Sequence, residues 1–156
     1  MKILYICTHN RCRSILSEAI TNHLAQGKLQ AFSAGSQPAG EVHPLSLKYL
    51  TQNGISTEGL KSQSWNDFAA HQPDIVITVC DSAANEACPL WFGDTITLHW
   101  GLPDPSKLNG SENEIREAFF SVMKTIEQRV QKLLALNLEA LTKEERQARL
   151  NDLAGA

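Results

Sequence analysis

The chain alternates between short apolar runs and longer stretches in which apolar residues recur at helical spacing. The short runs, which predict buried strands, cover residues 2–7, 30–35, 74–80 and 94–99. Helical spacing begins at Ser14, a favourable N-cap residue. A second helix is expected to open at Pro44 and to end at the Asn53-Gly54 pair, which is a helix-stop signal. A weaker pattern predicts a short helix at 65–70.

Two capping boxes predict the helices of the last third of the chain. Ser111 and Glu114 open a long helix, whose apolar positions fall on one side. These positions are Ile115, Phe119, Val122, Ile126, Val130 and Leu133. Thr142 and Glu145 open a final helix, which is mostly polar.

Strands that alternate with helices predict an α/β fold with a four-stranded, parallel, doubly wound sheet and helices on both faces. No repeat or linker divides the chain, so we expect one domain over residues 1–156, with 137–156 as a helical extension of unknown role. In such sheets, sites form beyond the carboxyl ends of the strands. Cys7 ends the first predicted strand, Cys80 ends the third, and Asp104 follows the fourth. All three are therefore expected at one edge of the sheet.

Composition narrows the classes of function. The net charge of −3 and the lack of a long basic run argue against nucleic acid as a partner. No apolar stretch is long enough to span a membrane, and the apolar run that ends at Cys7 is too short for a signal peptide. We therefore expect a cytoplasmic protein. In that reducing compartment, four cysteines more often serve catalysis, metal binding or packing than structural disulfides.

The segment between the first strand and the first helix has the form C-x5-R-S. Its residues are Cys7, Thr8, His9, Asn10, Arg11, Cys12, Arg13 and Ser14. A loop in this place can turn its N–H groups around an oxyanion, to which the helix dipole adds positive potential. Arg13 can hold two anion oxygens with its planar fork. The same donors lower the pKa of a cysteine at the first position, and Ser14 can donate to its thiolate. Cys7 is thus a candidate nucleophile towards a tetrahedral oxyanion.

Other interpretations of these residues stay open. By composition alone, roughly one chain in six or seven would pair one of four cysteines with an arginine at this spacing. Cys7 could then be an inert strand-end residue, although its place between a strand and a helix favours the nucleophile. Cys12 is expected to pack under the loop as a small hydrophobic residue. Arg11 and His9 are expected on the loop rim, where a surface histidine needs no further role.

The segment CTHNRCRS, followed by LSEAI, resembles the anion loop of low-molecular-weight tyrosine phosphatases and of the arsenate reductases that share their fold. The SAG segment at 33–35 and the Asp104-Pro105 pair are also similar, and the resemblance runs from Met1 to about Leu136. It implies that Asp104 is a general acid, and that the domain is catalytic. Asp104 could instead merely turn the loop before proline.

Two segments separate the reductase branch from the phosphatases. The phosphatases that resemble this chain usually carry tyrosine directly after Asp-Pro, where Ser106 stands here, and HWG before that pair is similar to the reductases. Cys80 and Cys88 resemble the redox pair of the thioredoxin-coupled enzymes, although the seven residues between them are slightly more than usual. Alone, Cys80 would be an ordinary buried residue and Cys88 an ordinary loop residue. Structural zinc is not expected, because C-x-x-C spacing is lacking.

This resemblance implies reduction of arsenate to arsenite, with phosphate or sulfate as competing anions. Cys80 and Cys88 would carry a disulfide cascade, residues 81–87 would move with it, and thioredoxin would be the reductant. Coupling to glutathione and glutaredoxin stays open. Two further alternatives are a phosphomonoester hydrolase that uses only Cys7, Arg13 and Asp104, and a non-catalytic oxyanion-binding regulatory module.

A potassium ion is often bound near the loop in the thioredoxin-coupled branch. Asn10, Glu18 and Ser33 match the positions of its ligands. The threonine and aspartate expected further along fall where Ser62 and Ser64 stand, which leaves the ion site open. We expect no tightly bound cofactor, with potassium as the one candidate.

Overall fold

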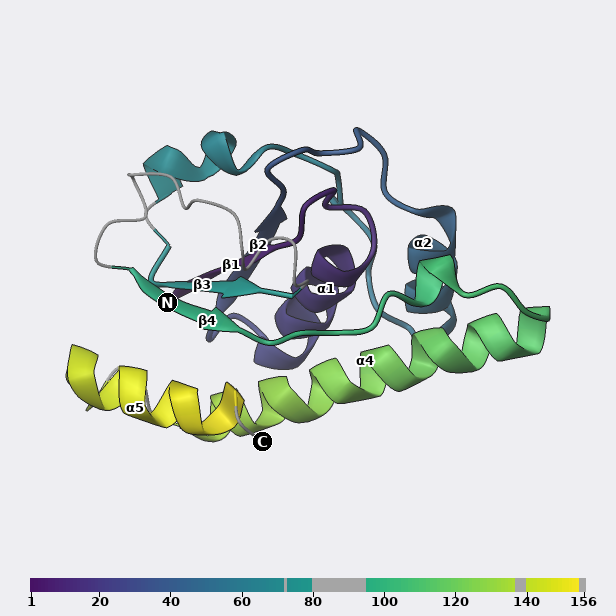
Figure 1. Ribbon diagram of the computed structural model, residues 1–156. Coiled ribbons are helices and arrows are strands. Elements are labelled where there is room, and N and C mark those ends of the chain that lie inside the picture. The colour runs from purple at the N-terminus through teal and green to yellow at the C-terminus, as the bar shows by residue number, and fades with distance from the viewer. Residues whose placement is uncertain (72, 80–94, 137–139, 155–156) are drawn as a thin grey trace.

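The computed structural model describes residues 1–71, 73–79, 95–136 and 140–154 (Figure 1). Its sheet has four parallel strands in the order β2-β1-β3-β4. The strands are β1 Lys2–Ile6, β2 Gln30–Ala34, β3 Ile75–Thr78 and β4 Ile96–His99. This order and direction confirm the predicted doubly wound sheet, and each strand begins and ends within two residues of its expected bounds.

Helices flank this sheet on both sides. The α-helices are α1 Arg13–Ala25, α2 Pro44–Gln52, α4 Glu112–Ala135 and α5 Lys143–Ala154, and the 3-10 helices are η1 Trp65–His71 and η3 Pro105–Lys107. Figure 1 shows α4 and α5 along one side of the sheet and η1 on the opposite side, which agrees with the expected arrangement. Within the described ranges, no helix combines the length and apolar character needed to cross a membrane.

The strand register places the functional candidates at one edge. Ile6, the last residue of β1, lies beside Ala34 of β2 and Thr78 of β3, and Thr78 lies beside His99 of β4. Parallel strands in this register end together, so the loops that follow them meet at the same edge. The segment that begins at Cys7 and the segment that leads to Asp104 both start there.

Most helix signals in the sequence are confirmed, with one exception. Ser111 and Glu114 form both bonds of a capping box at the start of α4, and Gly54 follows α2 with a φ of 71°. Ser14, however, does not cap α1, because that helix already includes Arg13 and its N-cap position is Cys12. The Ser14 hydroxyl lies inside the first turn and accepts a bond from Asn10 instead.

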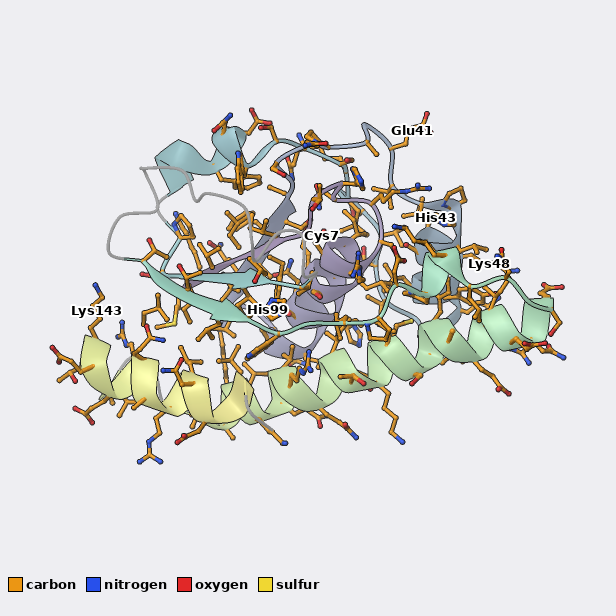
Figure 2. The ribbon with its side chains drawn as sticks, in the orientation of Figure 1. Cys7, Glu41, His43, Lys48, His99 and Lys143 are labelled. Carbon is orange, nitrogen blue, oxygen red and sulfur yellow. The ribbon has the colours of Figure 1, made fainter. Side chains whose placement is uncertain are left out.

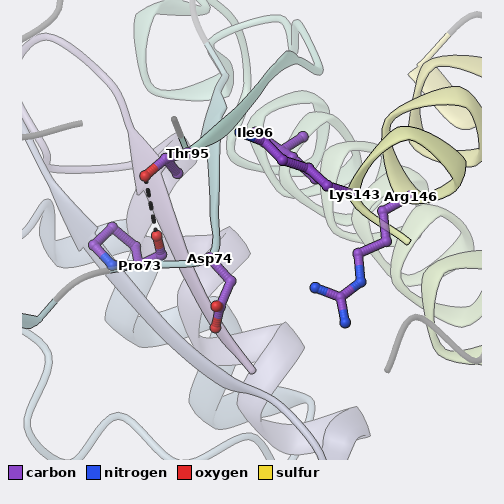
Figure 3. Close-up of a pocket in the computed structure, with 6 residues that line it drawn as sticks. All are labelled: Pro73, Asp74, Thr95, Ile96, Lys143 and Arg146. Carbon is purple, nitrogen blue, oxygen red and sulfur yellow. Dashed lines mark hydrogen bonds between the residues drawn. The ribbon is translucent and has the colours of Figure 1, made fainter. Parts of the chain in front are cut away.

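The C-terminal helix packs against the sheet through Leu150, which is fully buried, and lies next to β4 at the sheet edge. A cavity of about 380 Å³ lies between the start of α5 and the starts of β3 and β4 (Figure 3). It is lined by Pro73, Asp74, Thr95, Ile96, Lys143 and Arg146. Because it adjoins the amino ends of parallel strands, it lies at the edge opposite to Cys7, away from the predicted chemistry.

Candidate active site

The loop after β1 turns its carbonyl groups outward. The carbonyls of Thr8, His9 and Arg11 accept bonds from the backbone N–H groups of Gln37, Ala39 and His43, each at 2.9 Å. In a trans peptide, the C=O and the N–H of the next residue point in opposite directions. The N–H groups that follow these carbonyls therefore point into the loop. Near the N-terminus of α1, N–H groups in this arrangement suit the binding of an anion, as the sequence predicts.

Cys7 stands at the first position of this loop and is buried, at the junction of β1 and α1 (Figure 2). Gly35, at the end of the SAG segment, lies directly behind it. A Cβ atom at Gly35 would collide with the carbonyl oxygens of Cys7 and Thr8. Glycine is thus required here by the close approach of two backbone segments.

Asn10 holds the curvature of the loop from inside. It is fully buried and adopts a φ of 47°, a left-handed conformation that asparagine tolerates better than most residues. Its Nδ2 donates to Ser14 Oγ at 2.8 Å, and its Oδ1 accepts from the backbone N–H of Gln63 at 2.9 Å. The bond from Asn10 leaves the Ser14 hydroxyl proton unused. Donation of that proton to the Cys7 thiolate remains a prediction.

Arg13 is aligned by the segment that follows β4. Its Nη1 donates to the carbonyl of Leu102 at 3.1 Å, and its Nη2 lies 3.6 Å from Oδ2 of Asp104. Its Nε is buried and has no hydrogen-bond partner among the described residues. A buried charged donor without a partner is costly, and an oxyanion in the loop would supply the missing acceptor.

Asp104 turns the loop before Pro105 and also lies beside Arg13. Its Oδ1 accepts from the Ser106 backbone N–H at 3.0 Å and from the Ser106 hydroxyl at 2.6 Å, which caps the short helix η3. Its other oxygen faces Arg13. Asp104 therefore does turn the loop, and the same turn holds its carboxylate beside the residue expected to bind the anion.

The other loop residues differ in exposure. Cys12 is buried, as expected, and this burial raises the pKa of its thiol to about 11. Cys12 therefore stays protonated at neutral pH and is a poor nucleophile. His9 and Arg11 are exposed at the rim, where His9 Nδ1 lies 3.1 Å from the carbonyl of Gln37.

His43, which is absent from the predicted site, joins the loop to α2 (Figure 2). Its backbone N–H bonds to Arg11, and its Nδ1 accepts from the Leu45 N–H at 3.1 Å, so a neutral ring carries its proton on Nε2. Burial and the nearby Arg11 charge lower the pKa of His43, against the effect of Asp104. A histidine directly before a helix-opening proline is the sequence signal that could have identified this cap.

Cys80, Cys88 and residues 81–87 lie outside the described residues. The chain can be followed as far as Val79, whose N–H donates to the carbonyl of Ile6 at 2.9 Å. Ile6 and Val79 directly precede Cys7 and Cys80 in the sequence. The backbone therefore approaches the start of the loop just before Cys80.

The candidate potassium ligands lie together below the loop. Ser33 Oγ donates to Glu18 Oε1 at 2.6 Å, and Asn10 lies at the adjoining loop turn. Burial raises the pKa of Glu18 to about 7, and the bonds from Ser33 act in the opposite direction. In the part of the chain that the structure describes, no three His, Cys, Asp or Glu side chains form a group that could hold a metal.

We expect the Arg13→Lys variant to lose about 100-fold or more in kcat/KM although the charge is kept, because a lysine cannot offer two parallel donors to one anion. Steady-state kinetics with arsenate and an aryl phosphate would measure this loss. Arg116→Lys, the same change at an exposed position of α4, is the matched control. Near-wild-type kinetics of Arg13→Lys would show that the anion does not bind at Arg13.

Comparison with known proteins gives relatives that match along most of the chain. A family model described as low molecular weight phosphotyrosine protein phosphatase matches residues 2–147. The glutaredoxin arsenate reductase of Synechocystis sp. is 30% identical over 134 residues, which cover 86% of this chain and 96% of that protein.

Solved structures give the same assignment of the fold. An arsenate reductase in the phosphate binding state is 28% identical, with a TM-score of 0.68 over 86% of this chain and 96% of that chain. The thioredoxin-dependent arsenate reductase of Corynebacterium glutamicum is also 28% identical, with a TM-score of 0.61 over 83% of this chain and 61% of that chain.

The family match extends past Leu136, the expected end of the similarity, and reaches into α5. The matched residues include the loop with Cys7 and Arg13, the turn at Asp104 and all four strands of the sheet. This chain belongs to the low molecular weight phosphotyrosine protein phosphatase family.

Proposed function

We propose that this chain reduces arsenate to arsenite, with Cys7 as the nucleophile. The observation that carries the proposal is the buried Nε of Arg13, which has no hydrogen-bond partner among the described residues and lies beside a loop whose carbonyls turn outward. Such a site suits a tetrahedral oxyanion. Relatives named arsenate reductases, one of them solved in a phosphate binding state, support arsenate as substrate and phosphate as a competing anion. Sulfate has the same shape and would also compete.

In the first step, the Cys7 thiolate attacks arsenic while the loop N–H groups and Arg13 hold the other oxygens. A sulfur–arsenic bond forms and an arsenic–oxygen bond breaks. Asp104 acts as the general acid and gives a proton to the departing oxygen, which leaves as water. The position of Asp104 beside Arg13 supports this role.

In the second step, the Cys80 thiolate attacks the sulfur of Cys7. The electron pair of the sulfur–arsenic bond passes to arsenic, arsenite leaves, and a Cys7–Cys80 disulfide remains. Cys88 then attacks Cys80, which frees Cys7 and leaves a Cys80–Cys88 disulfide. The bond between Val79 and Ile6 supports the reach of Cys80, because it brings the backbone beside the residue before Cys7.

An external dithiol must reduce this last disulfide, and we propose thioredoxin in the cytoplasm. One relative is named a glutaredoxin arsenate reductase, and another is named a thioredoxin-dependent arsenate reductase. The deciding experiment supplies arsenate and compares thioredoxin with glutathione plus glutaredoxin as electron donors. Arsenite production that continues beyond one arsenite per chain with neither donor, in the presence of arsenate, would contradict the proposal.

A phosphomonoester hydrolase is the second candidate, favoured by the family match and by the presence of Cys7, Arg13 and Asp104. Hydrolysis of an aryl phosphate without any thiol donor, combined with no arsenate reduction, would select it. Binding of phosphate without either reaction would instead select the non-catalytic oxyanion-binding module.

The Asp104→Asn variant should slow formation of the arsenic adduct by about 10²- to 10⁴-fold, the usual effect of losing a general acid. The amide can still accept the bonds from Ser106, so the turn itself should persist. Single-turnover quenching would measure the step. Asp67→Asn, at an exposed position of η1, is the matched control. An unchanged adduct rate would remove Asp104 from this role.

A further inference from the structure

Gln63 lies under the anion-binding loop and binds both the loop and β2. Its backbone N–H donates to Asn10 Oδ1 at 2.9 Å, and its carbonyl accepts from the Gly35 N–H at 2.9 Å. Its side-chain Nε2 donates to the backbone carbonyl of Ser33 at 3.1 Å. One residue therefore ties the left-handed turn at Asn10 to the end of β2.

The chemistry of the contact with Ser33 fixes the orientation of the Gln63 amide. A backbone carbonyl can only accept hydrogen bonds, and of the two ends of a carboxamide only the NH2 end donates. The NH2 group of Gln63 must therefore face Ser33. This NH2 group therefore presents its hydrogens towards the Ser33 carbonyl oxygen, next to the candidate ion ligands.

These oxygens do not fit the potassium site that the family resemblance suggests. A protein binds potassium through oxygen lone pairs that replace the water around the ion. At each of the three candidate ligands, an oxygen already accepts one protein donor, so fewer lone pairs are left for an ion. Gln63 donates to Asn10 Oδ1 and to the Ser33 carbonyl, and Ser33 Oγ donates to a Glu18 carboxylate oxygen. The Gln63 NH2 group also offers hydrogens where an ion would need further oxygens.

The two serines expected to complete the ion site have other contacts. Ser62 Oγ donates to the carbonyl of His9 at 3.1 Å, which supports the rim of the loop. Ser64 Oγ accepts from the N–H of Asn66 at 3.2 Å, at the start of η1. Neither of these two contacts involves Asn10, Glu18 or Ser33.

We infer that the Gln63 amide replaces a monovalent cation in this chain, and that the anion loop is organised without potassium. The side-chain NH2 donates the hydrogen bond that the Ser33 carbonyl would otherwise lack. The backbone N–H of Gln63 holds Asn10 in its left-handed turn. Gln63 is thus a positioning residue. The inference rests on the proposed function only in taking this loop as the site of the oxyanion.

The first test compares salts at equal ionic strength, using the wild-type protein in potassium, sodium and choline chloride. Thermal unfolding and calorimetric titration with inorganic phosphate give the two readouts. We expect Tm to agree within about 1 °C and the phosphate Kd within about twofold in all three salts. A saturable, potassium-specific rise in Tm or in phosphate affinity would overturn the inference.

The second test removes the amide in two ways. Gln63→Met keeps the length of the side chain but leaves the Ser33 carbonyl without this donor, so Tm should fall by about 3–10 °C in every salt. Gln63→Glu replaces the NH2 by oxygen, and its Tm should fall in choline chloride and recover in part in potassium chloride. The Gln52→Glu variant, at the exposed end of α2, makes the same change of charge and should show neither effect.

If Gln63→Met matches the wild type in Tm and phosphate affinity, Gln63 is not a positioning residue and the inference fails. An equal fall in the Tm of Gln63→Glu in all three salts would likewise contradict the inference that the Gln63 amide replaces a cation. None of these readouts uses arsenate turnover. Failure of the proposed reduction and failure of this inference are therefore separable.

Discussion

The Cys7→Ser variant is expected to lose both arsenate reduction and any hydrolysis of aryl phosphates, by about 10⁴-fold or more. A hydroxyl stays un-ionised at neutral pH even where N–H groups and a helix N-terminus would stabilise a thiolate. The oxygen therefore cannot make the first attack, which both reactions share. Initial rates with each substrate, at saturating donor and in its absence, measure the loss.

Phosphate binding separates a chemical defect from a folding defect in this variant. Arg13 and the inward N–H groups remain in Cys7→Ser, so inorganic phosphate should still bind and raise Tm. Retained phosphate binding with no turnover is the expected pair of results. Substantial turnover by Cys7→Ser would show that another residue is the nucleophile. Cys12 is a poor candidate for that role, because burial raises the pKa of its thiol to about 11.

The fold was predictable because its signals are local. The apolar runs predicted the four strands, and the capping pairs at Ser111 and Thr142 predicted the starts of α4 and α5. The one wrong helix signal, the expected cap at Ser14, shows the limit of such signals. The helix already begins at Arg13, so Ser14 lies inside its first turn, where its hydroxyl accepts from Asn10, four residues earlier.

The contacts that shape the site were not predictable from local patterns. Arg13 is aligned by Leu102, 89 residues away, and Asn10 by Gln63, 53 residues away. Nothing in the sequence near Gln63 marks it as a partner of the loop. Ser106 differs, because a serine two residues after an aspartate and next to proline is a common turn arrangement, which could have predicted its bonds to Asp104.

The two branches of the family differ in the steps that come after the first attack. A phosphatase needs Cys7, Arg13 and Asp104 and then water, whereas a reductase needs two further thiols in sequence. Ser106 stands where the phosphatases that resemble this chain usually carry tyrosine, and its hydroxyl donates to Asp104.

The Cys88→Ser variant should bind arsenate, form the Cys7 adduct and release one arsenite per chain before it stops. Thiol exchange passes along a series of attacks, and each substitution removes one attacker. Cys88→Ser should therefore hold a Cys7–Cys80 disulfide, whereas Cys80→Ser should stop earlier with no disulfide at Cys7. Both variants should keep whatever aryl phosphate hydrolysis the wild type shows, because that reaction needs neither thiol.

Peptide mass spectrometry under non-reducing conditions, after a single turnover, distinguishes these states directly. The expected wild-type product is a Cys80–Cys88 disulfide, which Cys88→Ser cannot form. Thioredoxin-driven turnover of Cys88→Ser at the wild-type rate would make Cys88 a bystander. Coupling to glutathione and glutaredoxin would then be the better scheme, with Cys80 alone as the resolving thiol. Equal arrest of both variants before any arsenite is released would instead show that Cys80 and Cys88 act before reduction, and the proposed order of attacks would be wrong.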